Sequence, residues 1–179
     1  CYRKNGNLER AITELYRVID IKPDYIKAYI KLIEILKETE QKEDILPLYK
    51  KDLEIEPKKA SLHAEFARYC KELDEHNYVY RFEAAIAHTL VGQTEKAIEL
   101  YDELLKRNPN NISIIYNKGY TYKMQGDADI AIELYKKAIQ RDAHYDAAHF
   151  ALGMAYLIKG DFERGWKKHA RYLKQTNRN

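Results

Sequence analysis

Apolar residues recur three and four positions apart over most of the chain, which is the spacing of one face of an α-helix. The pattern is clear over Ile112–Gln125 and again over Ala128–Arg141. Between them, Gly126 stands where a residue free to adopt a positive φ can end a helix, and Asp127 follows where its side chain would cap the next one. The chain is therefore expected to consist of helices joined by short turns.

This helical pattern repeats along the chain with a period of 34 residues. The pentapeptide AIELY stands at Ala97–Tyr101 and returns at Ala131–Tyr135. Glycine, small and aromatic positions keep the same phase: Gly92, Gly126 and Gly160; Ala85, Gly119 and Gly153; and His88, Tyr122 and Tyr156. The small residues are expected to let two helices approach closely, with tyrosines filling the space beside them. One such pair of helices cannot bury its apolar face alone, so the pairs are expected to stack on one another.

This arrangement of small, glycine, aromatic and proline positions resembles the tetratricopeptide repeat (TPR) family. The resemblance implies an all-α fold in which helix-turn-helix repeats stack into a right-handed α–α superhelix, the TPR solenoid. Three regular repeats are expected over residues 78–179, with first helices that start near Tyr78, Ile112 and Asp146.

Residues 1–57 fit the repeat pattern less well. They are expected to form a half repeat followed by one degenerate repeat. In the degenerate repeat, Ile33 and Ile45 occupy positions that hold small residues in the regular repeats. Cys1–Asn5 would then be the end of a missing first helix, and a second helix would follow Gly6. Because the apolar side of that second helix would lack one neighbour, fraying or self-association is expected there.

Residues 58–77 interrupt the period. Leu62, Phe66, Cys70 and Leu73 share one face of a helix. An irregular extra helix is therefore expected in this segment, and it would separate the N-terminal part from the regular repeats. The alternative is that the repeat has only drifted and that the helices stack without a break.

Composition limits the classes of partner. The chain has 31 basic and 28 acidic residues, interspersed, with a formal net charge of +3, so neither nucleic acid nor an anionic membrane is expected as a partner. No apolar run approaches the roughly 20 residues that span a bilayer, and no membrane insertion is expected. The 16 tyrosines could stack on nucleic-acid bases, but several, such as Tyr49, Tyr101 and Tyr135, fall at positions that pack between helices.

The two cysteines, Cys1 and Cys70, give neither a zinc-binding spacing nor a disulfide framework. Cys70 lies on an apolar helix face and is expected to be buried. Cys1 could be a lipid-modified terminus, but residues 2–5 continue a helical pattern instead of forming the tether that normally follows a lipid anchor. Because the sequence starts without Met, it is interpreted as a fragment or a processed form.

No group of residues in the sequence indicates an active site. The six histidines show neither an HExxH motif nor a Cys/His ligand spacing. His88 and His169 occupy positions that are aromatic in other repeats and are expected to pack. The others occupy a large-residue position or lie near helix ends: His149, His63, His76 and His144. Neither a cofactor nor a metal is expected, and the chain is not expected to be an enzyme.

The resemblance does not extend to two specialised TPR binding sites. Chaperone-binding members hold a terminal carboxylate with Lys, Asn and Arg on successive first helices. Of the matching positions here only Asn117 fits; the full set is Phe82, Ile86, Asn117, Ala147 and Ala151. Sugar-transferase members line their groove with one Asn in every repeat, where this chain has Glu83, Asn117 and Ala151. Neither function is therefore expected.

The expected function is that of a protein–protein interaction scaffold. In TPR proteins the first helix of each repeat lines a concave groove, and the resemblance assigns this role to Phe82, Ile86, Tyr116, Tyr120, Lys123, Phe150 and Met154. The resemblance also assigns Thr89 to the groove. Most of these groove residues are apolar or aromatic, which suits an apolar or amphipathic partner peptide or helix, and Lys123 could pair with an acidic group. Alternatively, the 58–77 helix or a further C-terminal helix fills the groove, and these residues are core.

Two other functions stay open at this stage. The chain could be a regulatory or targeting segment of a larger enzyme. It could also be a self-assembling scaffold module that forms homo-oligomers through the end faces of its repeats.

Overall fold

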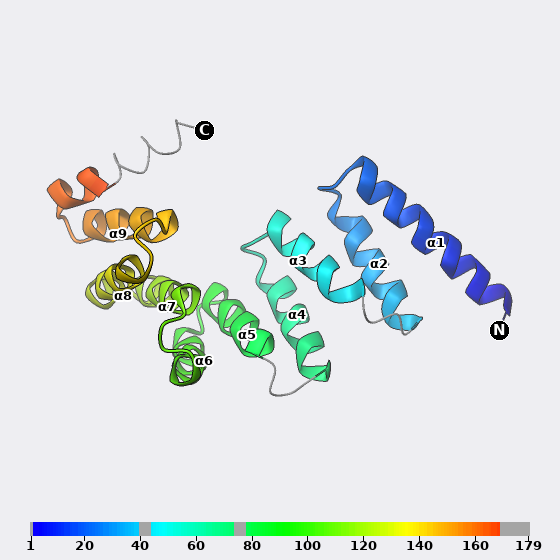
Figure 1. Ribbon diagram of the computed structural model, residues 1–179, viewed down its shortest axis with the longest axis horizontal. Coiled ribbons are helices and arrows are strands. Elements are labelled where there is room, and N and C mark those ends of the chain that lie inside the picture. Colours follow the sequence, from blue (N-terminus) through cyan, green and yellow to red (C-terminus); the bar gives the residue numbers. More distant parts are fainter. Residues whose placement is uncertain (1, 40–43, 74–77, 169–179) are drawn as a thin grey trace. The chain divides into compact units, whose positions relative to one another are not determined.

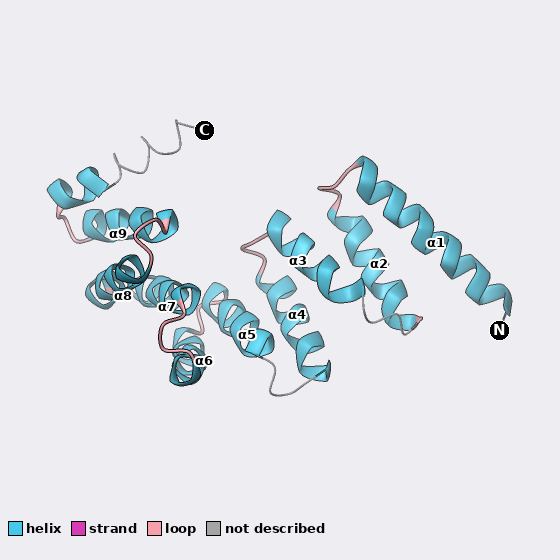
Figure 2. Cartoon of the chain, in the orientation of Figure 1, coloured by secondary structure: helices cyan, strands magenta, loops and turns pink. Residues whose placement is uncertain are grey.

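The computed structural model describes residues 2–39, 44–73 and 78–168. Within these ranges the chain forms helices and no strands (Figure 2). In order, the helices are α1 (Tyr2–Ile21), α2 (Ile26–Glu38), α3 (Ile45–Ile55), α4 (Ala60–Leu73), α5 (Tyr78–Leu90), α6 (Thr94–Arg107), α7 (Ile112–Gln125), α8 (Ala128–Arg141) and α9 (Asp146–Ile158). Residues 162–168 are also helical. The predictions for Cys1, His76 and His169 lie outside the described residues.

Contacts between helices divide the chain into two units, Cys1–Leu62 and His63–Asn179. In the first unit α1 packs on α2, and α2 packs on α3. In the second unit each helix from α5 to α9 packs on the next one along the chain (Figure 1). The segment 58–77 holds α4, and the division into residues 1–57, 58–77 and 78–179 stays a prediction.

The helices of the second unit keep the predicted register. α5, α7 and α9 begin at Tyr78, Ile112 and Asp146. The glycines that follow these helices, Gly92, Gly126 and Gly160, have φ angles of 78°, 101° and 78°. This left-handed conformation is one that glycine adopts without steric cost, so it ends the first helix of every pair at the same position. The expected all-α fold of stacked helix pairs is confirmed.

Two of the regular helix pairs, α5 with α6 and α7 with α8, each bury one tyrosine from the second helix. Tyr101 and Tyr135 occupy equivalent positions and are both fully buried. Tyr101 lies in a cluster with Ala85, Ala97, Leu104 and Ile114, and Tyr135 lies in one with Ala131, Ile132 and the apolar face of α9. Cys70 is also fully buried, as predicted.

The turn expected near Gly6 is absent, because α1 runs without a break from Tyr2 to Ile21. A glycine ends a helix where it takes up a positive φ. Inside a helix it costs only about 1 kcal/mol relative to alanine, and the rest of this 20-residue helix can offset that cost. Residues 2–5 therefore belong to the same helix as Leu8–Asp20.

The predicted cap of α8 is also wrong. Asp127 stands at the N-cap position, but its side chain accepts no hydrogen bond from the helix. Its ψ of 70° falls short of the extended conformation in which a capping side chain reaches back to the first turn. Asn111, with a ψ of 112°, does cap α7, since its Oδ1 accepts a hydrogen bond from the Ile114 amide at 3.1 Å.

We expect the amides of α1 to exchange faster than those of α8. None of the side chains described in α1 is buried, whereas α8 buries Ala131, Ile132, Tyr135 and Ala138. Elements with few buried contacts open with lower free energy. Hydrogen–deuterium exchange on a dilute monomer tests this expectation, and equally slow exchange over Leu8–Asp20 and Ala128–Arg141 would contradict it.

Candidate protein-binding site

The first helices of the repeats form one continuous wall within the second unit. α5 contacts α7 and α7 contacts α9, whereas no contact joins α6 to α8 in the described part of the chain. First helices therefore lie closer together than second helices. A stack with this asymmetry curves toward its first helices, which places α5, α7 and α9 on the inner wall.

The residues predicted to line the groove lie on these three helices. α5 carries Phe82 and Ile86, α7 carries Tyr116, Tyr120 and Lys123, and α9 carries Phe150 and Met154. None of the seven is fully buried. Phe150 is the most accessible, with 36% of its surface exposed, and the other six are half-buried. Their role in binding a partner stays a prediction.

Two of the groove residues also contribute to the core. Phe82 packs against the cluster around Tyr101, with its ring centroid 6.3 Å from that of Tyr101 in an edge-on arrangement. Tyr116 lies 5.7 Å from Tyr135 and 5.4 Å from Tyr145, ring centroid to ring centroid. Truncating either side chain would therefore change stability as well as any binding surface.

Lys123 and Tyr120 form a second kind of contact on this wall. The Lys123 Nζ atom lies 4.4 Å from the centroid of the Tyr120 ring, within the range of a cation–π interaction. The interaction holds a positive charge beside an aromatic face, so this part of the wall combines apolar surface with a cation.

Thr89 does not line the groove, contrary to the prediction. Its side chain is buried, and its Oγ1 lies 2.7 Å from the Oγ1 of Thr121, which is also buried. The Tyr101 hydroxyl is hydrogen-bonded to the same two side chains. Since a buried hydroxyl needs a partner, these three side chains turn toward one another between the helices.

The equivalent tyrosine in the next repeat lacks such partners. At the positions 34 residues after Thr89 and Thr121 the chain has Lys123 and Ala155. The Tyr135 hydroxyl is buried without a hydrogen-bond partner among the described residues. Burial raises the pKa of both Tyr101 and Tyr135, because it disfavours the charged phenolate.

Removing the two hydroxyls should therefore have different effects. Tyr101→Phe is expected to lower the free energy of unfolding by about 1 kcal/mol, since it breaks a satisfied buried network. Tyr135→Phe is expected to leave stability unchanged or raise it, because it removes an unpaired buried polar group. Chemical denaturation of both variants measures the difference, and a larger loss for Tyr135→Phe would refute the explanation.

A buried polar pair joins α4 to α5. The Nδ1 atom of His63 lies 2.6 Å from Oε2 of Glu83, and the two side chains are 7% and 12% exposed. His63 was predicted to lie near a helix end, and its contact with Glu83 was not predicted. The two positions lie 20 residues apart, outside the period of 34, so no repeat pattern links them.

The other histidines in the described ranges make local contacts. His149 is buried, and its Nε2 lies 2.9 Å from the carbonyl oxygen of Ala143. His88 is half-buried, with its Nδ1 2.7 Å from Oε1 of Gln93. Residues 2–39, 44–73 and 78–168 contain no cluster of three or more His, Cys, Asp or Glu side chains that could hold a metal ion. In the same ranges, no helix combines the length and hydrophobicity needed to cross a membrane.

Comparison with protein families identifies the repeats. Residues 87–126 match a family model described as "TPR repeat", and residues 116–175 and 1–25 match models described as "Tetratricopeptide repeat". The chain belongs to the tetratricopeptide repeat family, and the predicted TPR solenoid fold is confirmed.

Solved TPR structures show the same fold at low sequence identity. A tetratricopeptide repeat protein from Parabacteroides merdae has a TM-score of 0.60 at 15% identity, over 96% of this chain and 73% of that one. PilW, a widely conserved type IV pilus biogenesis factor, has a TM-score of 0.58 at 15% identity, over 99% and 90%. YrrB, a TPR protein with an unusual peptide-binding site, has a TM-score of 0.54 at 15% identity, over 89% and 91%. No curated protein matches the sequence.

Proposed function

We propose that the chain is a non-catalytic scaffold that binds an apolar or amphipathic segment of a protein partner along the wall of α5, α7 and α9. The observation that carries this proposal is the accessibility of apolar side chains on the wall. Phe150 is 36% exposed, and Tyr120 and Met154 are half-buried. Side chains of this kind are typical of grooves that receive the apolar face of a peptide or helix.

The chemistry of the wall favours an amphipathic partner. Tyr120 and Lys123 together offer an aromatic face and a cation, so an apolar segment that also carries an acidic residue would match both. The relatives give support at the level of the fold alone. A TPR protein of similar fold, YrrB, is described as having a peptide-binding site, and TPR proteins serve as interaction scaffolds.

Selection from a phage-displayed library of random 16-residue peptides tests the proposal. The selected peptides are expected to share apolar residues at helical spacing. Phe150→Glu is expected to weaken their binding at least about tenfold, because it places a charge in a desolvated contact. Ile130→Glu is the matched control, since Ile130 is 44% exposed but lies on α8, a second helix. The control is expected to bind like the wild type.

Thermal unfolding separates binding from folding in this experiment. Both positions are accessible, so both variants are expected to melt within a few degrees of the wild type. Equal loss of binding in the two variants, or selected peptides without apolar residues, would contradict the groove assignment. Tyr116→Ala is unsuitable as a test because Tyr116 packs against two core clusters.

Self-assembly is the second candidate function. Phe162 and Trp166 lie four residues apart on the helix of residues 162–168 and are 62% and 58% exposed, and Ile158, at the end of α9, is 62% exposed. Exposed apolar side chains at helical spacing favour association with another copy of the chain. Sedimentation velocity at two concentrations tests this candidate: the wild type should gain a larger species at the higher concentration, and Phe162→Glu should remove it.

A further inference from the structure

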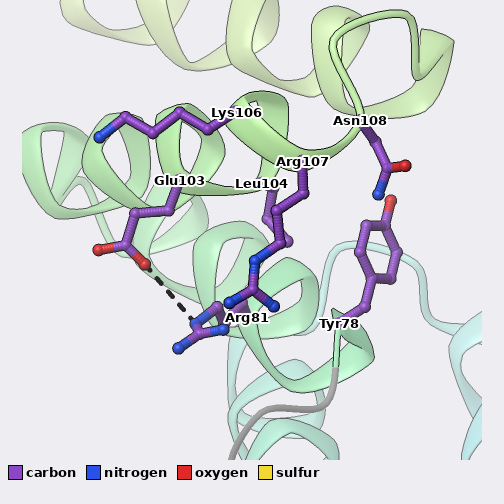
Figure 3. A pocket seen from close by; sticks show the side chains of 7 residues that line it. All are labelled: Tyr78, Arg81, Glu103, Leu104, Lys106, Arg107 and Asn108. Carbon is purple, nitrogen blue, oxygen red and sulfur yellow. Dashed lines mark ion pairs between the residues drawn. The ribbon is translucent and has the colours of Figure 1, made fainter.

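A pocket of about 510 Å³ lies between the start of α5 and the end of α6 (Figure 3). Its walls come from one repeat and contain none of the groove residues. The lining residues are Tyr78, Arg81, Glu103, Leu104, Lys106, Arg107 and Asn108. The pocket is therefore a separate surface from the groove described above.

The lining of this pocket carries three cations and one carboxylate. The Nε atom of Arg81 lies 3.6 Å from Oε2 of Glu103, and these side chains are 23% and 56% exposed. Figure 3 shows the guanidinium of Arg107 directed toward that of Arg81, whereas the Tyr78 ring stands apart from both, with its hydroxyl toward Asn108. Two guanidinium groups in one pocket repel each other, and an anion between them would turn this repulsion into attraction.

Packing of the repeat does not require these charges. In the next repeat the residue equivalent to Arg81 is Ile115, which is fully buried in a core cluster. The equivalents of Glu103 and Lys106 are Lys137 and Gln140, and only Arg107 has a like residue, Arg141. The combination of cations is therefore specific to the pocket and is not a feature of the repeat.

We propose that this pocket binds the carboxylates of an acidic segment of a protein partner. Guanidinium groups form paired hydrogen bonds with carboxylates, which are stronger than hydrogen bonds between neutral groups. Tyr78 forms one side of the pocket, and its hydroxyl accepts a hydrogen bond from Nδ2 of Asn111 at 3.0 Å. The lining offers three cations beside one carboxylate, a small local charge that suits a short acidic peptide better than the many phosphates of a nucleic acid.

Fluorescence anisotropy with a fluorescein-labelled hexaglutamate peptide tests the proposal, using the full chain at low ionic strength. The wild type is expected to bind hexaglutamate and not hexaglutamine. Arg81→Gln and Arg107→Gln are each expected to raise the dissociation constant at least about tenfold, since each removes charge-assisted hydrogen bonds. Arg141→Gln is the matched control. It makes the same change at the equivalent exposed position of the next repeat and should change the constant less than about twofold.

Several outcomes would overturn the proposal. One is the absence of hexaglutamate binding, and another is an equal effect of Arg107→Gln and Arg141→Gln, which would indicate general electrostatic attraction. Equally tight binding of a hexauridylate, or displacement of the peptide by inorganic phosphate at the peptide's own concentration, would also overturn it. Arg81 is largely buried, so if Arg81→Gln fails to fold, the exposed Arg107 decides the result. None of these failures would affect the groove proposal, because no groove residue lines the pocket.

Discussion

Replacing His63 with leucine is expected to lower the free energy of unfolding by about 3 kcal/mol, because it leaves a buried acidic side chain without its hydrogen-bond partner. The Glu83 side chain is only 12% exposed, and the Nδ1 atom of His63 lies 2.6 Å from its carboxylate. The substitution removes this ring nitrogen. A carboxylate that loses its partner in a buried site cannot recover the hydration it gave up on folding. Chemical denaturation at neutral pH measures the change.

A double-mutant cycle separates this effect from the loss of the imidazole itself. His63→Leu combined with Glu83→Leu is expected to recover most of the stability, since two apolar side chains can replace a buried polar pair at little cost. His144→Leu serves as the matched control because His144 is exposed, and it should stay close to the wild type. A double variant as unstable as His63→Leu alone would show that the pair is not the cause.

The regular features of the fold could be predicted because they recur along the sequence. Gly92, Gly126 and Gly160 each follow the end of a first helix, where the backbone has a positive φ. Because glycine is the residue that adopts this conformation most easily, its regular recurrence in the sequence shows where these helices end. The buried tyrosines Tyr101 and Tyr135 were predicted for the same reason. Periodicity therefore predicted the helices α5 to α9 and the positions at which they pack.

Contacts that do not recur were not predicted. His63 on α4 and Glu83 on α5 form a pair that lies outside the repeat period, and Arg81 lines a pocket at a position that is apolar in the next repeat. Thr89 was predicted to line the groove, but its hydroxyl forms a hydrogen bond with that of Thr121 in the core. The spacing of residues shows which face of a helix a side chain occupies, whereas its partner depends on neighbouring helices whose residues differ between repeats.

Gly119→Leu is expected to be the most informative change in the regular repeats. A Cβ atom at Gly119 would lie 2.9 Å from Cε1 of Tyr135 and 3.2 Å from Cβ of Leu134, closer than carbon atoms normally approach. Overpacking of this kind costs about 1–3 kcal/mol, while replacing a glycine inside a helix returns up to about 1 kcal/mol. A net loss of about 1–2 kcal/mol is therefore expected, measured by chemical denaturation.

The loss should extend beyond the pair α7 and α8. Tyr135, which must move, contacts Tyr116 and belongs to the cluster that includes Leu152 and Tyr156 on α9. Faster amide exchange in α9 of Gly119→Leu would therefore accompany the lower midpoint, because each repeat depends on its neighbours. Gly119→Ala should have a smaller effect, and Gln140→Leu, on the exposed side of α8, should be nearly neutral. An unchanged midpoint for Gly119→Leu would mean that α7 and α8 do not meet at this glycine.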